Sequence, residues 1–290
     1  MSVFTGKSAL VTGASAGLGE EFALQLADLG VRHLVLTARR ADRLADIKAT
    51  LAAAHPDLHV ETIVADLSRE EGVTQLISDL GKGPLDGFSC DILINNAGLG
   101  DLGTFETSEP ERIEAMLAVN IVALTRLTRW AVPEMLEKKV GWICNVGSTA
   151  GLIPLPTFAV YAATKAYVNS FSEALRIELH GSGVKVLALC PGPVETEFGQ
   201  VASRKNSKRK FAPPAFLCVR KTDVVHETLQ ALAYGQARLI PGLMVRFPML
   251  LAESTPRWIL RLIFNWTSGD FRDERLGKKT AKFERTYKLL

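Results

Sequence analysis

Tyr161 and Lys165 are residue types that acid–base chemistry uses, and their spacing places them together. The two open a helical pattern over residues 161–179. At this spacing the phenol and the ammonium lie on one helix face, about one turn apart, and both can point into one cleft. A Tyr-x-x-x-Lys pair also occurs on solvated helix faces, so it indicates a catalytic site only when other site residues accompany it.

Ser148 is the third residue of this group. It follows an apolar strand-like run over residues 142–146, at the carboxyl edge where open α/β sheets bind ligands. A turn serine between Gly147 and Thr149 is the alternative interpretation. The strand over residues 142–146 and the turn after it must therefore place Ser148 next to the helix that carries Tyr161.

A glycine-rich turn, Thr12-Gly13-Ala14-Ser15-Ala16-Gly17-Leu18-Gly19, follows the first expected strand and opens a helix. Glycines permit a tight turn and close approach of the backbone to a pyrophosphate, while a helix N-terminus offers free N–H groups. The turn therefore predicts a dinucleotide site, although an ordinary β-to-α connection could carry the same glycines.

The second expected strand ends in Thr37-Ala38-Arg39-Arg40, where an NAD enzyme usually places an acidic side chain for the ribose 2′-hydroxyl. Here no carboxylate is present. The guanidinium of Arg39, and less clearly that of Arg40, suits a 2′-phosphate, which favours NADPH/NADP over decoration of an exposed loop.

These residues need a scaffold, and the apolar pattern predicts one. Short apolar runs alternate with longer helical patterns, as in repeated βαβ units. The fold class we expect is α/β, a Rossmann-type doubly wound parallel sheet with a C-terminal helical extension. The expected strands are residues 8–12, 33–37, 60–65, 91–95, 142–146, 184–189 and 238–241, and the expected helices are 18–29, 42–54, 113–135, 161–179 and one that opens at Pro256.

Taken with Asn95-Asn96-Ala97-Gly98, Asn120 and Pro191-Gly192, these motifs resemble the classical short-chain dehydrogenase/reductase family from about Ser8 to Phe198. The resemblance implies that Tyr161 is the general acid/base, and that Lys165 lowers its pKa and binds the nicotinamide ribose. It implies that Ser148 stabilises the substrate oxygen. It also implies that Asn120 holds a water in a proton relay, with local helix bonding as the rival role.

For the cofactor, the resemblance implies an adenine contact at Asp66, an adenine-ribose lining at Asn96 to Gly98, and a nicotinamide cover at Pro191 to Thr196. The cofactor-binding residues expected are Gly13, Ser15, Gly17, Leu18, Gly19, Arg39, Arg40, Asp66, Leu67, Asn96, Ala97, Gly98, Tyr161, Lys165, Pro191, Gly192, Val194 and Thr196.

Two segments depart from the minimal family core. Residues 193–221 read as a substrate loop, and its basic run at 203–210 either recruits an anionic substrate or only aids solubility. Residues 236–290 hold the last strand and an extension that we assign to the same domain as residues 1–235. Residues 236–290 contain eleven Lys/Arg and five Asp/Glu, so this segment is basic, whereas the rest of the chain carries a net charge of −3.

The stretch 239–266 is apolar, but charges and prolines interrupt it before it reaches the roughly 20 residues that span a bilayer. Trp258, Ile259, Leu262, Ile263 and Trp266 recur at helical spacing. They could form a wall for a lipophilic substrate, rest on a membrane surface or pack in an oligomer. These three alternatives stay open.

Composition restricts the function classes. The four cysteines are isolated, which argues against a metal site and structural disulfides. Nucleic-acid binding would require basic residues interleaved with aromatics over a defined fold, and the sequence indicates no such fold. We expect a cytoplasmic homo-oligomer, with peripheral membrane contact as an open alternative. Its function is expected to be hydride transfer between NADPH and a small-molecule carbonyl or alcohol. A non-catalytic NADPH-binding sensor or scaffold is the rival.

Overall fold

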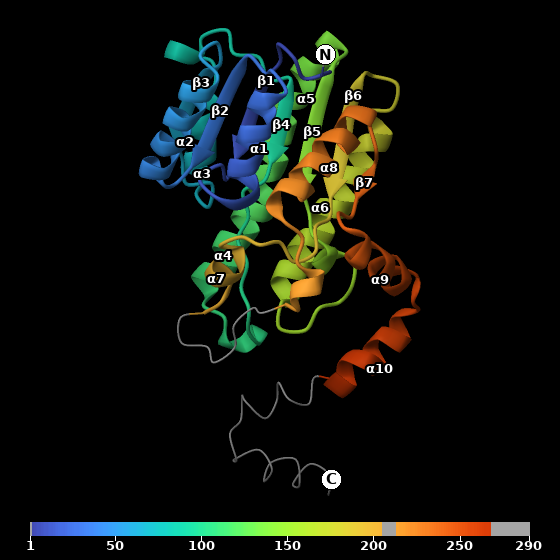
Figure 1. Ribbon diagram of the computed structural model, residues 1–290. Helices are drawn as coiled ribbons and strands as arrows, with labels where there is room; N and C mark the ends of the chain where they lie inside the picture. Colours follow the sequence, from blue (N-terminus) through green and yellow to red (C-terminus); the bar gives the residue numbers. More distant parts are fainter. Residues whose placement is uncertain (1, 205–212, 268–290) are drawn as a thin grey trace, which may run out of the picture.

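The computed structural model describes residues 2–204 and 213–267, and the sheet lies at its centre (Figure 1). Seven parallel strands run in the order β3-β2-β1-β4-β5-β6-β7, which confirms the predicted Rossmann-type fold. Their bounds are β1 Ser8–Thr12, β2 His33–Ala38, β3 His59–Val64, β4 Ile92–Asn95, β5 Gly141–Val146, β6 Val184–Leu189 and β7 Arg238–Leu239.

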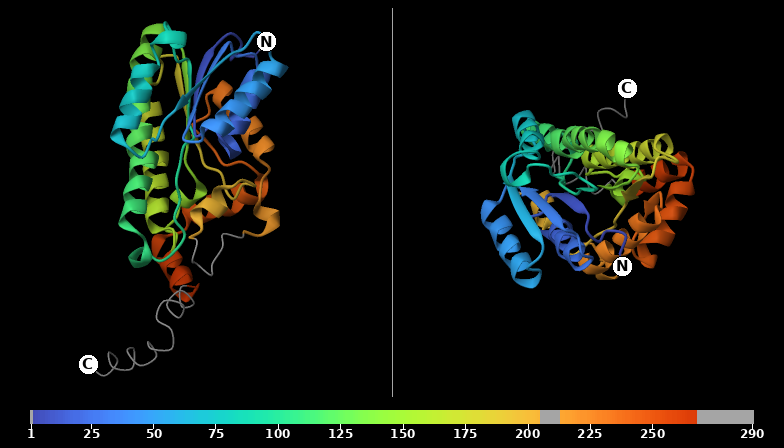
Figure 2. Two further views of the ribbon diagram at one scale, coloured as in Figure 1. Left: turned by 90° about the vertical axis from the view of Figure 1, so that its left-hand side faces the viewer. Right: turned by 90° about the horizontal axis from the view of Figure 1, so that it is seen from above.

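Helices cover both faces of the sheet, which explains why the strands are apolar throughout (Figure 2). In β1, Ala9 and Val11 pack into one apolar layer and Leu10 into the other. The first layer is closed by α1 (Gly17–Asp28), α2 (Ala41–Ala54) and α8 (Lys221–Tyr234), and the second by α3 (Glu70–Asp79), α5 (Leu124–Lys138) and α6 (Ala159–Glu178).

The chain reverses its direction of winding between β1 and β4, which are neighbours in the sheet. At such a switch point the two connections leave in opposite directions and open a crevice at the carboxyl ends of the strands. The shorter elements gather below this edge in Figure 1. They include α4 (Pro110–Leu117), α7 (Phe198–Ala202), α9 (Leu243–Ser254) and α10 (Arg257–Thr267), and the short turns η2 (Phe105–Thr107), η4 (Thr149–Gly151) and η5 (Ala215–Leu217). The turn η1 (Gly83–Leu85) lies at the opposite edge, beside the first residues of β2 and β3.

The helix expected over residues 113–135 is longer and more complex than predicted. It starts with α4, widens into the π-helical turn η3 (Ala118–Ala123), and continues as α5 to Lys138, beyond the predicted end near Pro133 and Met135. Proline inside a helix costs about 3 kcal/mol. Leu127, Ala131 and Met135 are buried against the sheet, and burying three such side chains offsets a cost of that size.

The C-terminal extension separates into two helices with different surroundings. In α9, Val245 is buried in a small cluster with Ile240. Pro256 directly precedes α10, as predicted, but Trp258 and Leu262 are 62% and 61% exposed. The predicted apolar face of α10 therefore points outward over these residues rather than into the protein. The side chain of Trp266 lies outside the described residues.

Candidate active site

A cavity of about 790 Å³ lies at the carboxyl ends of β1, β4, β5 and β6. Its lining includes the glycine-rich turn, the loops after β2 to β6, the start of α6, and parts of α7 and α9. A crevice at the switch point is where open parallel sheets bind ligands. The cavity therefore has two ends, one beside the glycine-rich turn and one beside α9.

The glycine-rich turn is shaped for a close backbone approach. Gly13 and Gly17 have φ of +65° and +60°, a region that favours glycine. A Cβ on Gly13 would lie 2.8 Å from the Cα of Ala97. Ala16, the N-cap of α1, cannot supply a side-chain acceptor, so the first N–H groups of α1 stay available. A pyrophosphate fits these donors.

At the adenosine end, Arg39, Arg40, Asp66 and Leu67 line the cavity. Arg40 is anchored: its Nε donates to Ser15 Oγ at 3.3 Å and its Nη1 pairs with Glu197 at 3.1 Å.

The environment of Asp66 is positive. Burial opposes its ionisation, but hydrogen bonds from Ser68 and the charge of Arg39 together hold the pKa of Asp66 below its usual value. Arg39 is exposed, with its charge directed to this end of the cavity. These residues can hold the adenosine part of a nicotinamide cofactor.

Ser148, Tyr161 and Lys165 meet in the middle of the cavity. Burial raises the pKa of Tyr161 to about 12, so the lowered pKa that the family resemblance implied is not found here; a hydrogen bond with Ser148 acts in that direction without reversing the effect of burial. Burial lowers the pKa of Lys165 to about 8. Its Nζ donates to the carbonyl of Val146 at 2.7 Å and lies 5.8 Å from the centroid of the Tyr161 ring. A phenol, a hydroxyl and an ammonium thus share one buried pocket.

Asn120 lies behind this group, in the π-helical turn η3. Its amide accepts from Leu99 N at 2.8 Å and donates to Leu99 O and Thr164 Oγ1, both at 2.9 Å. A Cβ on Gly98 would lie 3.5 Å from Asn120 Oδ1 and 3.4 Å from Lys165 Nζ. Asn120 therefore braces the loop after β4 next to Lys165. The water relay stays a prediction.

Of the described residues predicted for the site, Gly19 and Asn120 lie outside the cavity lining. A side chain on Gly19 would overlap the carbonyl of Gly13 and the amide of Asn96, so Gly19 lets α1 pack against the turn. The other predicted cofactor residues and the catalytic trio line the cavity. Within the basic run, residues 205–210 lie outside the described part of the chain.

The far end of the cavity is apolar, and sequence reasoning found it only in part. Residues of α9 line it, within the stretch predicted as a wall, whereas α10 does not. The helix α7 lies within residues 193–221, the predicted substrate loop, whereas the turn before α6 was not predicted as lining. The apolar side chains at this end are Ile153, Leu155, Phe158, Phe198, Val201, Leu217, Met244, Val245, Pro248 and Met249. The run of apolar residues between Ser148 and Tyr161 was the signal available.

Residues 7–207 match the family model described as short chain dehydrogenase. The chain belongs to this family. Among its relatives, an uncharacterized short-chain type dehydrogenase/reductase of Sinorhizobium fredii is 39% identical over 70% of this chain and 75% of its own length. The very-long-chain 3-oxoacyl-CoA reductase of Homo sapiens is 30% identical over 90% of this chain and 79% of its own.

Solved short-chain dehydrogenases have the same fold. One from Sphingobium yanoikuyae in complex with NADPH has a TM-score of 0.73 and 30% identity, covering 88% of this chain and 95% of the other. One from Burkholderia phymatum in complex with NAD has a TM-score of 0.74 and 28% identity, covering 90% and 96%. This short-chain dehydrogenase is thus an oxidoreductase that uses a nicotinamide cofactor and acts on a small molecule.

Proposed function

We propose that this protein is an NADPH-dependent reductase of lipophilic ketones or aldehydes, or runs the reverse oxidation of the alcohol. The observation that carries the proposal is a single cavity that holds the glycine-rich turn at one end, apolar side chains at the other, and Ser148, Tyr161 and Lys165 between them. When bound, the reduced nicotinamide supplies the hydride that the carbonyl carbon accepts.

In reduction, Tyr161 gives its phenolic proton to the carbonyl oxygen, which becomes the hydroxyl of the alcohol. Burial keeps this phenol protonated at neutral pH, because its pKa is raised to about 12. Ser148 donates a hydrogen bond to the same oxygen and stabilises the negative charge that develops on it. The ammonium of Lys165 then stabilises the phenolate that remains.

The preference for NADPH is supported by the residues after β2. Arg39 and Arg40 stand where an NAD enzyme has an acid, and no carboxylate occurs between Thr37 and Arg40. Because Arg40 is tied to Ser15 and Glu197, Arg39 is the guanidinium that we assign to the 2′-phosphate. The NADPH complex of the Sphingobium relative agrees with this assignment, whereas the Burkholderia complex with NAD shows that the fold alone does not decide it.

A lipophilic substrate is supported by the far end of the cavity, where α7, α9 and the turn before α6 contribute apolar side chains. Such a wall favours substrates by apolar area, at about 25 cal/mol per Å². The name of the human relative, a very-long-chain 3-oxoacyl-CoA reductase, points to a long apolar substrate in that protein. We infer the same physical class for this cavity.

Replacement of Tyr161 by Phe tests the proposal. The variant keeps the ring and loses the transferable proton, so kcat for ketone reduction should fall about 10²–10⁴-fold while the Kd for NADPH stays unchanged. Tyr167→Phe is the matched control, because Tyr167 is on the same helix and bonds Thr125 away from the cavity. A Tyr161→Phe variant with more than a tenth of the normal kcat contradicts the role of Tyr161. Tight NADPH binding without turnover of any carbonyl would favour the sensor.

A further inference from the structure

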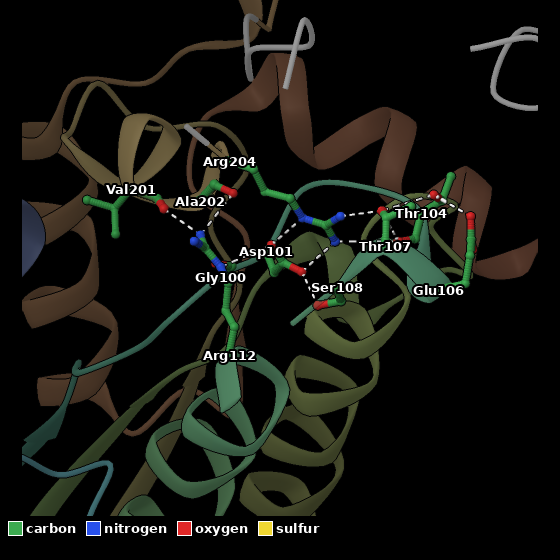
Figure 3. A network of polar contacts seen from close by, with 10 residues as sticks. All are labelled: Gly100, Asp101, Thr104, Glu106, Thr107, Ser108, Arg112, Val201, Ala202 and Arg204. Atoms are coloured by element: carbon green, nitrogen blue, oxygen red, sulfur yellow. Dashed lines mark hydrogen bonds and ion pairs between the residues drawn. The ribbon is translucent and has the colours of Figure 1, made fainter. Parts of the chain in front are cut away.

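A buried ion-pair network joins the loop after β4 to the end of α7 (Figure 3). The carboxylate of Asp101 is its centre, with a side chain only 4% exposed. Arg204 donates to it twice, from Nε at 2.9 Å and from Nη2 at 2.7 Å, and Ser108 donates its hydroxyl at 2.5 Å. Arg112 pairs with the same carboxylate at 3.0 Å. One buried anion thus holds two guanidinium groups.

Arg112 also closes the carboxyl end of α7. Its Nη2 donates to the carbonyls of Val201 at 2.6 Å, Ala202 at 3.2 Å and Gly100 at 3.1 Å. The last carbonyls of a helix have no partner within the helix, and a cation at that end stabilises them. Arg112 therefore links the end of α7 to the loop that carries Asp101.

The backbone and two glycines complete the contact. Leu102 N donates to Ala202 O at 2.9 Å, and Leu102 forms a parallel bridge with Ser203. A Cβ on Gly100 would lie 2.7 Å from the ring of Phe198, and one on Gly103 would overlap the guanidinium of Arg204. We call Gly100, Asp101, Gly103 and Arg112 the α7 seat, because each one contacts a residue of α7 or the residues directly after it.

The seat matters for the cavity because α7 carries lining residues. Phe198, the first residue of α7, lies with its ring centroid 5.4 Å from that of Tyr161, and Val201 also lines the cavity. Asp101, Arg112 and Arg204 are not among the lining residues that the structure describes. These three therefore act on the substrate through the elements that they hold in place, and among these α7 contributes Phe198 and Val201 to the lining.

We propose that Asp101, together with Arg112 and Arg204, is a positioning residue that holds α7 against the loop after β4. The position of α7 in turn sets the size of the substrate that the cavity accepts beside Tyr161. The kinetic part of the proposal rests on the proposed reductase function. The structural part, the fixing of α7, does not depend on it.

Charge explains why Asp101 is decisive. Burial opposes ionisation of Asp101, but the hydrogen bonds from Arg204 and Ser108, with the charges of Arg204 and Arg112, hold its pKa below the usual value. The carboxylate is therefore ionised at neutral pH. With an amide in its place, two guanidinium groups would meet without an anion between them, and removal of one partner from a buried pair is strongly destabilising. The end of α7 should then leave its seat.

Asp101→Asn tests the kinetic part, with 2-decanone as a bulky substrate and acetone as a small one. We expect KM for 2-decanone to change about tenfold, because the loss of charge-assisted hydrogen bonds typically has that size. KM and kcat for acetone, and the Kd for NADPH, should stay within about threefold. Asp57→Asn, at an exposed position beyond α2, is the control. Equal changes in KM for both ketones, or none, would overturn the proposal.

Gly103→Ala reaches the same contact without touching the carboxylate, since its methyl group would displace the Arg204 guanidinium. It should reproduce the change in selectivity, whereas Gly81→Ala should not, because a Cβ there meets no atom within 4 Å. Gly103→Ala also keeps the proposal testable if Asp101→Asn does not fold. Normal selectivity in Gly103→Ala would count against the seat.

Hydrogen–deuterium exchange measures the seat without any turnover. The amides of Leu102, Val201 and Ser203 are hydrogen-bonded to Ala202, Glu197 and Gly199. In Asp101→Asn their exchange should become at least about tenfold faster, with exchange in β5 unchanged. Unchanged exchange overturns the fixing of α7. If the wild-type protein reduces no ketone, the reductase function is refuted. If exchange is nevertheless faster in Asp101→Asn, the structural part of the proposal remains supported.

Discussion

The two ends of the cavity are built in different ways. The cofactor end is shaped mainly by the backbone: Gly13 and Gly17 adopt positive φ, and the N-terminus of α1 presents its N–H groups. At the substrate end, side chains from α7, α9 and the turn before α6 form an apolar wall. A pyrophosphate has one fixed shape and charge, so few residues fit it. An apolar wall needs only area and volume, which many residue types supply.

The largest expected effect of this difference is the intolerance of the cofactor end to one methyl group. Gly13→Ala places a Cβ 2.8 Å from the Cα of Ala97 at a φ of +65°. Steric overlap and left-handed strain together cost a few kcal/mol, so the Kd for NADPH should rise about 100-fold. Titration of the nicotinamide fluorescence measures it, with Gly81→Ala as control. A Kd within threefold of normal would remove the contrast between the two ends.

The next effect concerns the charge at the cofactor end. The double change Ala38→Asp with Arg39→Ala replaces a phosphate-binding cation by a carboxylate that repels it. The preference for NADPH over NADH should fall tenfold or more, since a hydrogen bond to a charged group contributes about 1.5–3 kcal/mol. Steady-state KM values for both cofactors measure the ratio. Arg40→Ala should change it less, because Arg40 already binds Ser15 and Glu197. Equal KM values in the unaltered protein would refute the preference.

The same contrast explains how far sequence alone could go. The alternation of apolar runs and helical patterns predicted the parallel sheet, and the strands β1 and β6 have the expected bounds. The glycines and the Tyr-x-x-x-Lys pair were readable because their chemistry fixes residue type and spacing together. Helix ends were less readable: α5 passes through Pro133 because its contacts with the sheet outweigh the local cost of proline.

What sequence could not give depends on contacts between distant segments. Asp101 and Arg204 are 103 residues apart, and no local pattern marks them as partners. Arg204 stood in a basic run predicted either to recruit an anionic substrate or to aid solubility, yet its side chain binds a buried carboxylate. Trp258 and Leu262 had the spacing of an apolar face with three open roles, a substrate wall, a membrane contact or an oligomer contact, and in α10 they are exposed and do not line the cavity. Periodicity identifies an apolar face without telling what covers it.

The pH dependence of reduction tests the catalytic group between the two ends. Burial lowers the pKa of Lys165 to about 8, so its ammonium is charged below that pH and loses its charge as the pH rises through 8. Tyr161, with its pKa raised to about 12, keeps its proton over the same range. The kcat/KM for ketone reduction should therefore fall about tenfold per pH unit above 8, because kcat/KM reports ionisation in the free enzyme. A flat profile from pH 6 to 10, with activity recovered at pH 7, would contradict this role of Lys165.

The smallest expected effect is at the substrate end, where the wall should tolerate change. Met249 of α9 lines the cavity, and Met249→Ala removes part of its apolar contact with a substrate. KM for 2-decanone should rise about fivefold, as the loss of roughly 1 kcal/mol implies, and KM for acetone should stay unchanged.

Leu262→Ala is the matched control, since Leu262 is 61% exposed on α10 and is not part of the lining. It should leave both KM values unchanged. An increase in Leu262→Ala would extend the wall to α10, and no increase in Met249→Ala would remove α9 from it. Either result would also weaken the comparison between the two ends of the cavity. If KM does not depend on the lining residues, or depends on residues outside the lining, the substrate end does not bind its substrate through a wall of apolar contacts. The cofactor end would then be the only part of the cavity whose function follows from its shape.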